Sequence, residues 1–272
     1  MKAKISAKVK NAFKSFRLTR KAFSYPYILF LLLFVVIPLV LVLVYAFLDA
    51  NEDFTFRNFV SLFTDGASLK VLLTSILVGI ITTALCLILG YPVAYILSKY
   101  RAGKILVLLF VLPMWVNFLI RTLATKAIFV ALDIRLGMGT VLFGMVYNYL
   151  PFMILPLYTT LSNLDKSYEE ASMDLGADKL TTFVKTVLPL SVPGIISGMT
   201  MVFIPTISTF AISQLLSDYT IFLFGDSIQT KFSNNMYGVG SVMSLIMIVL
   251  VLLSNFLLNK FNKGESAGRN LW

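Results

Sequence analysis

The stretch DKSYEEASMDLGADKLTTFVKTVLP, Asp165–Pro189, decides the fold, because it is polar and patterned yet lies between two long apolar runs. Ser167 and Glu170 have the spacing of a capping box at a helix start, and Gly176 suits a left-handed helix end. Asp178 predicts the start of a second helix that Leu188-Pro189 closes. We therefore expect two short helices, each presenting an apolar face to solvent. Those faces are formed by Tyr168, Ala171, Ser172 and Leu175, and by Leu180, Phe183, Val184 and Val187.

The chain on either side of this stretch is strongly apolar. Hydrophobic residues make up 58% of the sequence and charged residues 13%, against about one quarter charged residues in soluble domains. Most of the apolar runs reach the roughly 20 residues that a helix needs to cross a bilayer. We predict an all-α polytopic membrane protein with six transmembrane helices. The runs are Ile28–Leu48, Val71–Ser98, Ile105–Ile120, Thr140–Leu164, Val192–Leu216 and Tyr237–Asn259.

The placement of charge predicts the topology. Basic residues gather in residues 1–26, in the loop that carries Lys99, Arg101 and Lys104, and in residues 260–272, and such segments stay in the cytoplasm. Both termini and the stretch 165–189 are therefore expected inside. The acids of the expected external loops are Asp49, Glu52, Asp53, Asp65, Asp218 and Asp226. The net charge of +10 is explained by this topology, so the predicted partner is the lipid bilayer and not nucleic acid.

We divide the chain into a basic N-terminal segment 1–26, a six-helix transmembrane domain 27–259 that includes the loop 165–189, and a tail 260–272. The first apolar run is longer than the 7–15 residues of a signal-peptide core, so we expect an uncleaved first helix. Ile5, Val9, Phe13 and Phe16 fit an amphipathic segment on the inner leaflet, and a solvated basic segment is an equal alternative.

The charge of the loop predicts its partner. Residues Asp165–Lys185 carry a net charge of −2 on a basic chain. An anionic inner leaflet would repel such a segment, whereas a groove in a soluble protein could take up its apolar faces. We therefore favour protein docking over lipid binding.

This loop resembles the Glu-Ala-Ala loop of bacterial ABC importer permeases. Glu170-Ala171, Gly176 and Leu188-Pro189 match that pattern in register, while Ser172 and Thr186 depart from its second alanine and its isoleucine. The resemblance implies a type I ABC importer permease fold and a loop that docks on a cytoplasmic ATPase. The implied coupling residues are Glu169, Glu170, Ala171, Asp174, Gly176, Ala177, Leu188 and Pro189.

The sequence contains no Gly-x-x-x-x-Gly-Lys-Ser/Thr phosphate loop. We expect a non-catalytic membrane subunit that binds no cofactor itself, with ATP and Mg²⁺ used by the partner ATPase.

The wider chain is similar to the spermidine/putrescine (PotB-type) permease family. The matching segments are Leu112–Trp115 with Ile120–Thr122, Tyr147–Pro156, and Leu188-Pro189 with Pro193-Gly194. The resemblance implies polyamine import across a bacterial inner membrane. It also implies a PotC-like second permease, two copies of a PotA-like ATPase and an extracytoplasmic PotD-like binding protein. Import of sulfate, iron or another small solute is the alternative.

Candidate residues for the translocation pathway are Trp115, Asn117, Arg121, Tyr147, Asn148 and Tyr149. The 16 residues Ile105–Ile120 would cover about 24 Å, so Arg121 is expected in the outer part of the bilayer. It either lines an outer vestibule or reaches to the interface as a helix-end arginine. The aromatic residues fit cation binding or plain helix packing. No expected span contains an acid, so tight cation binding is expected in the external binding protein.

Two other functional classes fit less well. A channel or secondary transporter would show internal repeats or an ionisable relay within the membrane. An intramembrane hydrolase would need a nucleophile with a base, and the sequence contains no histidine.

Overall fold

A computed structural model describes residues 24–49 and 53–269; helices joined by short connections form this part of the chain, with one isolated bridge between Leu48 and Phe54. The amphipathic segment expected before residue 24 lies outside the described residues. The elements are α2 Ser24–Leu31, η1 Leu32–Val36, α3 Ile37–Ala46, α4 Arg57–Thr64, α5 Gly66–Lys99, α6 Gly103–Val111, η2 Leu112–Trp115, α7 Phe118–Ala131, α8 Met138–Ser162, α9 Ser167–Asp174, α10 Lys179–Thr182, η3 Phe183–Val187, α11 Leu188–Leu190, α12 Val192–Ser208, α13 Ile212–Leu216, α14 Phe224–Ser233 and α15 Tyr237–Arg269.

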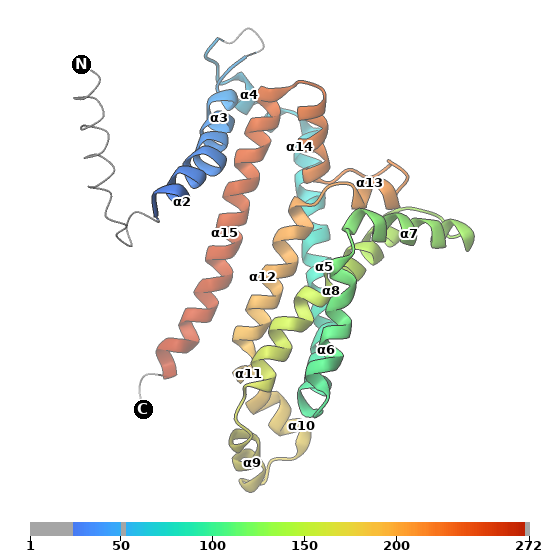
Figure 1. Ribbon diagram of the computed structural model, residues 1–272, viewed down its shortest axis with the longest axis vertical. Coiled ribbons are helices and arrows are strands. Elements are labelled where there is room, and N and C mark those ends of the chain that lie inside the picture. Colours follow the sequence, from blue (N-terminus) through green and yellow to red (C-terminus); the bar gives the residue numbers. More distant parts are fainter. Residues whose placement is uncertain (1–23, 50–52, 270–272) are drawn as a thin grey trace, which may run out of the picture.

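Of the six expected spans, four are single long helices and two are pairs of helices joined at a bend. Four helices are long and apolar enough to cross a membrane, at Tyr25–Ala46, Gly66–Lys99, Met138–Ser162 and Tyr237–Leu258. Two bent pairs of helices bring the number to six when each pair is counted as one span. Figure 1 shows α9 at one end of the bundle and α4 and α14 at the other, and α15 runs toward the end that carries α9. The acidic loops and the coupling loop thus lie at opposite ends, as expected.

Helices α5, α8 and α12 form the centre of the bundle. Their shared core includes the buried side chains of Cys86, Met153 and Leu157. Small residues let membrane helices approach closely, and Gly198 is one of them: a Cβ built on it would lie 2.6 Å from the Met153 sulfur. The loop that follows α8 therefore extends from a closely packed part of the bundle.

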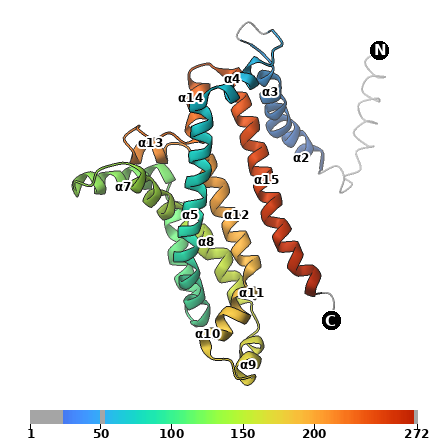
Figure 2. The same cartoon turned by 180° about the vertical axis from the view of Figure 1, so that it is seen from behind.

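The third span is broken, so the prediction of one helix over Ile105–Ile120 is wrong. The first part, Gly103–Trp115, meets the second, Phe118–Ala131, at 90°. The break lies at Val116 and Asn117, since the backbone of Val116 is extended and the Asn117 side chain caps α7 by accepting a hydrogen bond from the Leu119 amide at 2.8 Å. Both views show α7 projecting sideways from the bundle (Figures 1 and 2).

The fifth span also ends earlier than predicted. Its helix α12 stops at Ser208, and Thr209 is extended, so the expected run to Leu216 is wrong. Ala211 then takes a left-handed conformation, with φ of 71°, and starts the separate helix α13. At its other end α12 meets Lys179–Leu190 at 62°.

The first span lies at the edge of the molecule, and the last helix is longer than expected. None of the residues in the membrane-length window of the first span is buried, and Figure 1 shows α2 and α3 beside α15. The last helix continues through residue 269. Most of the expected tail 260–272 is therefore helical, and residues 270–272 lie outside the described part.

Candidate coupling loop and outer cavity

The loop between α8 and α12 forms the tip of the bundle in both views (Figures 1 and 2). It contains a first arm, α9, and a second arm made of α10, η3 and α11. The predicted pair of short helices is therefore confirmed. The way in which each arm begins and ends differs from the prediction in several details.

The first arm is capped by Asp165 and not by the predicted Ser167–Glu170 capping box. The Ser167 amide donates a hydrogen bond to the Asp165 carboxylate at 3.0 Å. Hydrogen bonds from Ser167 also hold the pKa of Asp165 below its usual value. A carboxylate at this position is suited to the start of a helix, because it faces the positive end of the helix dipole.

Gly176 ends the first arm as predicted. Its φ is +89°, in the left-handed region that favours glycine. The Gly176 amide donates to the Met173 carbonyl at 2.9 Å, and the Ala177 amide donates to the Ser172 carbonyl at 3.2 Å. This pair of bonds is a Schellman motif, which satisfies carbonyls at the helix end and turns the chain sharply.

The second arm begins at Asp178, as predicted. The Asp178 carboxylate accepts from the Thr181 amide at 3.0 Å, and hydrogen bonds from the Thr181 hydroxyl and amide lower its pKa. The arm was expected to close at Leu188-Pro189, but it continues to Leu190. A π-helical turn, η3, precedes the proline, because Pro189 lacks an amide donor and its ring crowds the preceding turn.

Only part of the predicted apolar surface is presented to solvent. Leu175 is 90% exposed and Leu180 69% exposed, and Tyr168 is also exposed. Val187 is instead buried, and Phe183 packs edge-on against Tyr95 with ring centroids 5.1 Å apart. The exposed apolar surface therefore lies mainly at the tip of the loop and includes Val184 of the second arm, while Phe183 and Val187 pack against the bundle.

One predicted coupling residue ties the loop to α5. Glu169 forms an ion pair with Lys99, the last residue of α5. The Lys99 ammonium lies 5.2 Å from the centre of the Tyr95 ring, and Tyr95 contacts Phe183 of the second arm. Both arms thus contact the same end of α5.

The other predicted coupling residues divide into two places. Glu170, Ala171, Asp174 and Gly176 are exposed on the first arm and its turn, and Ala177 is half-buried beside them. Leu188 and Pro189 lie at the foot of the second arm, where Leu188 packs against the core. The structure brings the first group together at the tip and separates it from the last two residues.

The predicted pathway residues do not form one site. Tyr147 lines an apolar cavity of about 320 Å³ with Pro113. Trp115 is exposed on η2 and Asn117 caps α7. A second cavity, of about 300 Å³ and here called the outer cavity, holds the other three. It is lined by Phe118, Arg121, Asn148, Tyr149, Phe152, Pro205, Ser208, Thr209 and Phe210.

The outer cavity contains polar atoms without partners. Arg121 is only 9% exposed, and its Nε and Nη1 atoms are buried without a hydrogen-bond partner among the described residues. Asn148 donates to the Gly144 carbonyl at 2.8 Å, but its buried Oδ1 has no partner there. Such groups are costly to bury unpaired. The Arg121 Cζ lies 6.0 Å from the centre of the Tyr147 ring, which offsets part of that cost.

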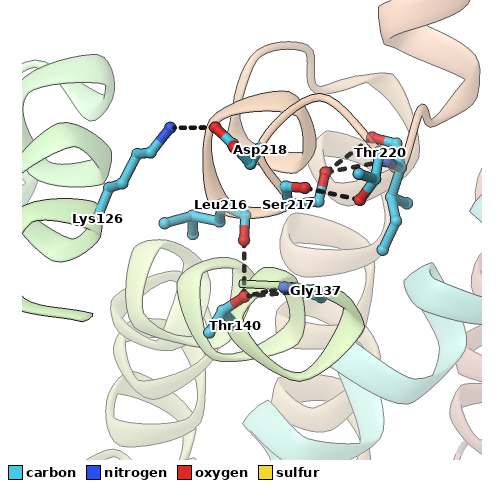
Figure 3. Close-up of polar contacts among 8 residues, drawn as sticks. Lys126, Gly137, Thr140, Leu216, Ser217, Asp218 and Thr220 are labelled. Atoms are coloured by element: carbon cyan, nitrogen blue, oxygen red, sulfur yellow. Dashed lines mark hydrogen bonds and ion pairs between the residues drawn. The ribbon is translucent and has the colours of Figure 1, made fainter. Parts of the chain in front are cut away.

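Sequence reasoning missed how α13 is held between α7 and α8. Lys126 of α7 pairs with Asp218 at 3.0 Å, and the Thr140 hydroxyl donates to the Leu216 carbonyl at 2.7 Å (Figure 3). These contacts join segments far apart in the sequence, and no local pattern indicates them.

Asp226 has a structural role that the sequence did not indicate. It is fully buried, and its carboxylate accepts from the Ala211 and Leu223 amides at 2.8 Å each and from the Ser213 hydroxyl. It thereby holds α13 against the start of α14.

Residues 87–266 match the family described as "Binding-protein-dependent transport system inner membrane component". The chain belongs to this family. As an inner membrane component of such a system it is a multi-pass permease, and it works in an ABC transporter complex with a binding protein and an ATPase.

Several curated relatives cover most of the chain. The spermidine/putrescine transport system permease protein PotB of Escherichia coli (strain K12) is 35% identical over 229 residues, which are 75% of this chain and 83% of the relative. PotB of Haemophilus influenzae is 36% identical over 260 residues, 86% of this chain and 90% of the relative. A PotB homolog of Mycoplasma genitalium is 28% identical over 207 residues, 71% and 73% of the two chains.

Solved structures show the same fold at low sequence identity. A chain of a bacterial ABC transporter involved in alginate import has a TM-score of 0.62 at 14% identity, and the match covers 94% of this chain and 99% of that one. A chain of the MetNI methionine ABC transporter has a TM-score of 0.57 at 16% identity, covering 74% and 99%. The fold is thus that of ABC importer permeases.

Proposed function

We propose that this permease imports polyamines, with spermidine or putrescine as substrate. The observation that carries the proposal is the similarity to PotB proteins at 35–36% identity over 75–86% of the chain. The chain would form half of a translocation pathway. Its specific partners would be a PotC-like permease, two copies of a PotA-like ATPase and a PotD-like binding protein.

The loop 165–189 would be the ATPase-docking segment. Its exposed tip combines the apolar side chains of Leu175 and Leu180 with the acids Glu170 and Asp174, a surface suited to a groove in a soluble protein. Movement of the tip would reach the membrane helices in two ways, through the Glu169–Lys99 pair at the end of α5 and through the buried foot of the second arm.

The exposed and cavity-lining residues of the outer half would guide the substrate without binding it tightly. Trp115, Tyr147 and Tyr149 offer aromatic faces for ammonium groups. No acid lies among the residues that line the outer cavity. Affinity for a polycation would therefore come from the binding protein.

A second candidate substrate is an inorganic anion such as sulfate. The buried Arg121 guanidinium with unpaired nitrogens favours it, because guanidinium groups bind oxyanions well. The two candidates make opposite predictions for charge selectivity.

The direct test is ATP-dependent uptake into vesicles that hold this chain with its co-purified subunits. Labelled spermidine, putrescine and sulfate would be supplied together with the cognate binding protein, with ATP or a non-hydrolysable analogue inside. We expect uptake of a polyamine that needs hydrolysable ATP. Uptake of sulfate but of neither polyamine would overturn the proposed substrate, and uptake that ignores ATP would overturn the importer mechanism.

A further inference from the structure

We infer that Arg121 forms an ion pair with a carboxylate of the second permease subunit. The outer cavity would then receive this carboxylate only when the two permeases assemble. The inference rests on the proposed pairing with a second permease. It also rests on the proposed cationic solute, because an anionic solute could itself bind Arg121.

Arg121 has no anionic partner among the described residues. Two of its three guanidinium nitrogens are buried without partners among the described residues. A buried arginine remains charged, and an uncompensated buried charge is strongly destabilising. The Tyr147 ring, 6.0 Å away, supplies a weak attraction that does not replace a carboxylate.

The acids of this chain that lie in the adjoining region already have partners. Helix α13 packs against α7, which carries Arg121, so Asp218 and Asp226 are the acids of the adjoining region. Asp218 pairs with Lys126 at 3.0 Å, and Asp226 accepts three hydrogen bonds at the α13–α14 junction. The missing anion must therefore come from outside the described part of the chain.

The outer cavity is large and polar enough to hold a carboxylate. It encloses about 300 Å³ beside Arg121 and also contains the unpaired Oδ1 of Asn148. A carboxylate in the cavity could draw the guanidinium toward itself, and the turned guanidinium could then donate to Asn148 as well. One of the lining residues, Phe210, is a large apolar side chain that is 41% exposed, and a partner helix would cover it.

The positive charge of a polyamine makes it an unsuitable partner for Arg121. An unpaired guanidinium would repel a polyamine, so Arg121 cannot act as a substrate ligand for one. Pairing with a carboxylate would neutralise the site and leave a cation free to pass. The structure thus favours a protein carboxylate over the solute as the group that Arg121 binds.

The test uses Arg121→Lys in the full transporter complex. The variant keeps a positive charge but introduces an amine that a carbodiimide can join to a neighbouring carboxylate. Peptide mapping by mass spectrometry, without added substrate, is expected to find position 121 linked to an acid of the second permease. The link from Lys126 to Asp218 within this chain serves as the internal control, because these groups already lie 3.0 Å apart.

A rescue experiment separates pairing from mere proximity. Arg121→Glu is expected to abolish co-purification of the second permease, and changing the linked acid to arginine is expected to restore it. The inference is overturned if position 121 links only within this chain, or stays unlinked in an intact complex while the control link forms. It is also overturned if sulfate suppresses the link, which would make an anionic solute the ligand. A link that forms in a complex without polyamine uptake would count against the polyamine proposal alone.

Discussion

The Thr186 hydroxyl donates a hydrogen bond to the Ser172 hydroxyl across 3.2 Å, joining the two arms of the coupling loop. A second contact of 3.2 Å joins Ser172 to the Thr182 hydroxyl. Ser172 and Thr186 are also the two positions at which the loop departs from the Glu-Ala-Ala pattern. The departures therefore compensate each other, since a polar contact takes the place of an apolar one.

A double-mutant cycle with Ser172→Ala and Thr186→Val tests this pairing. Each hydrogen bond of this kind contributes about 0.5–1.5 kcal/mol. Thr186→Val removes one such bond and should increase local opening of the loop by up to roughly tenfold, whereas Ser172→Ala removes both contacts and should increase it further. The double variant should lose less than the sum of the two. Hydrogen exchange of the α9 amides in the assembled transporter measures the opening, and strictly additive effects would show that the two hydroxyls do not interact.

Gly176→Ala should disturb the turn between the arms. A left-handed conformation costs a residue with a Cβ about 1–2 kcal/mol, and Gly176 has φ of +89° with open space around it. We expect slower uptake with ATP hydrolysis retained, which is the signature of weakened coupling. Gly66→Ala is the matched control, because Gly66 also has open space but no positive φ. Equal behaviour of the two variants would exclude a special role for the turn.

Asp226→Ala should destabilise the outer end of the bundle. The change leaves two buried amides and a hydroxyl without an acceptor, at about 1–3 kcal/mol for each unsatisfied group. A lower midpoint of thermal unfolding of the purified complex is expected. Asp218→Asn is the control, since the Asp218 side chain is 71% exposed in its ion pair and should contribute little, and asparagine tolerates the φ of 53° at this position. A larger loss in the control would contradict this assignment.

The cap at Asp178 predicts how the second arm responds to pH. Hydrogen bonds from Thr181 lower the pKa of this carboxyl from its model-compound value of 3.8. A lowered folded-state pKa means that the stabilisation is present above 3.8 and is lost only as the pH falls through the folded-state value. After correction for intrinsic exchange rates, protection of the Thr181 amide should stay constant from about pH 8 to about pH 5. Asp178→Ala should remove it throughout that range.

The sequence predicted those features that depend on local chemistry. Apolar length located the six spans, and Gly176 and Asp178 marked the turn between the arms, because a positive φ and a helix cap leave clear signals in residue type. The breaks at Asn117 and after Ser208 were missed, because both runs are apolar enough overall to be interpreted as continuous spans. An asparagine in an apolar run was the available signal for the first break.

Contacts between distant segments could not be predicted. The Glu169–Lys99 pair, the burial of Asp226 and the unpaired state of Arg121 all depend on how the helices pack. The exposed face of the second arm was overestimated for the same reason: a helical period identifies an apolar face but does not say what covers it. Phe183 faces Tyr95 of α5 and not solvent.

The central claim is that the tip of the loop docks on the ATPase. The most direct measurement places a photo-crosslinking phenylalanine derivative at Leu175, which is 90% exposed, and separately at Leu252, which is 63% exposed on the span α15. After illumination of the assembled transporter, we predict an adduct with the ATPase from position 175 and none from position 252. Absence of the adduct from position 175 in an assembled complex, or equal adducts from both positions, would contradict the account.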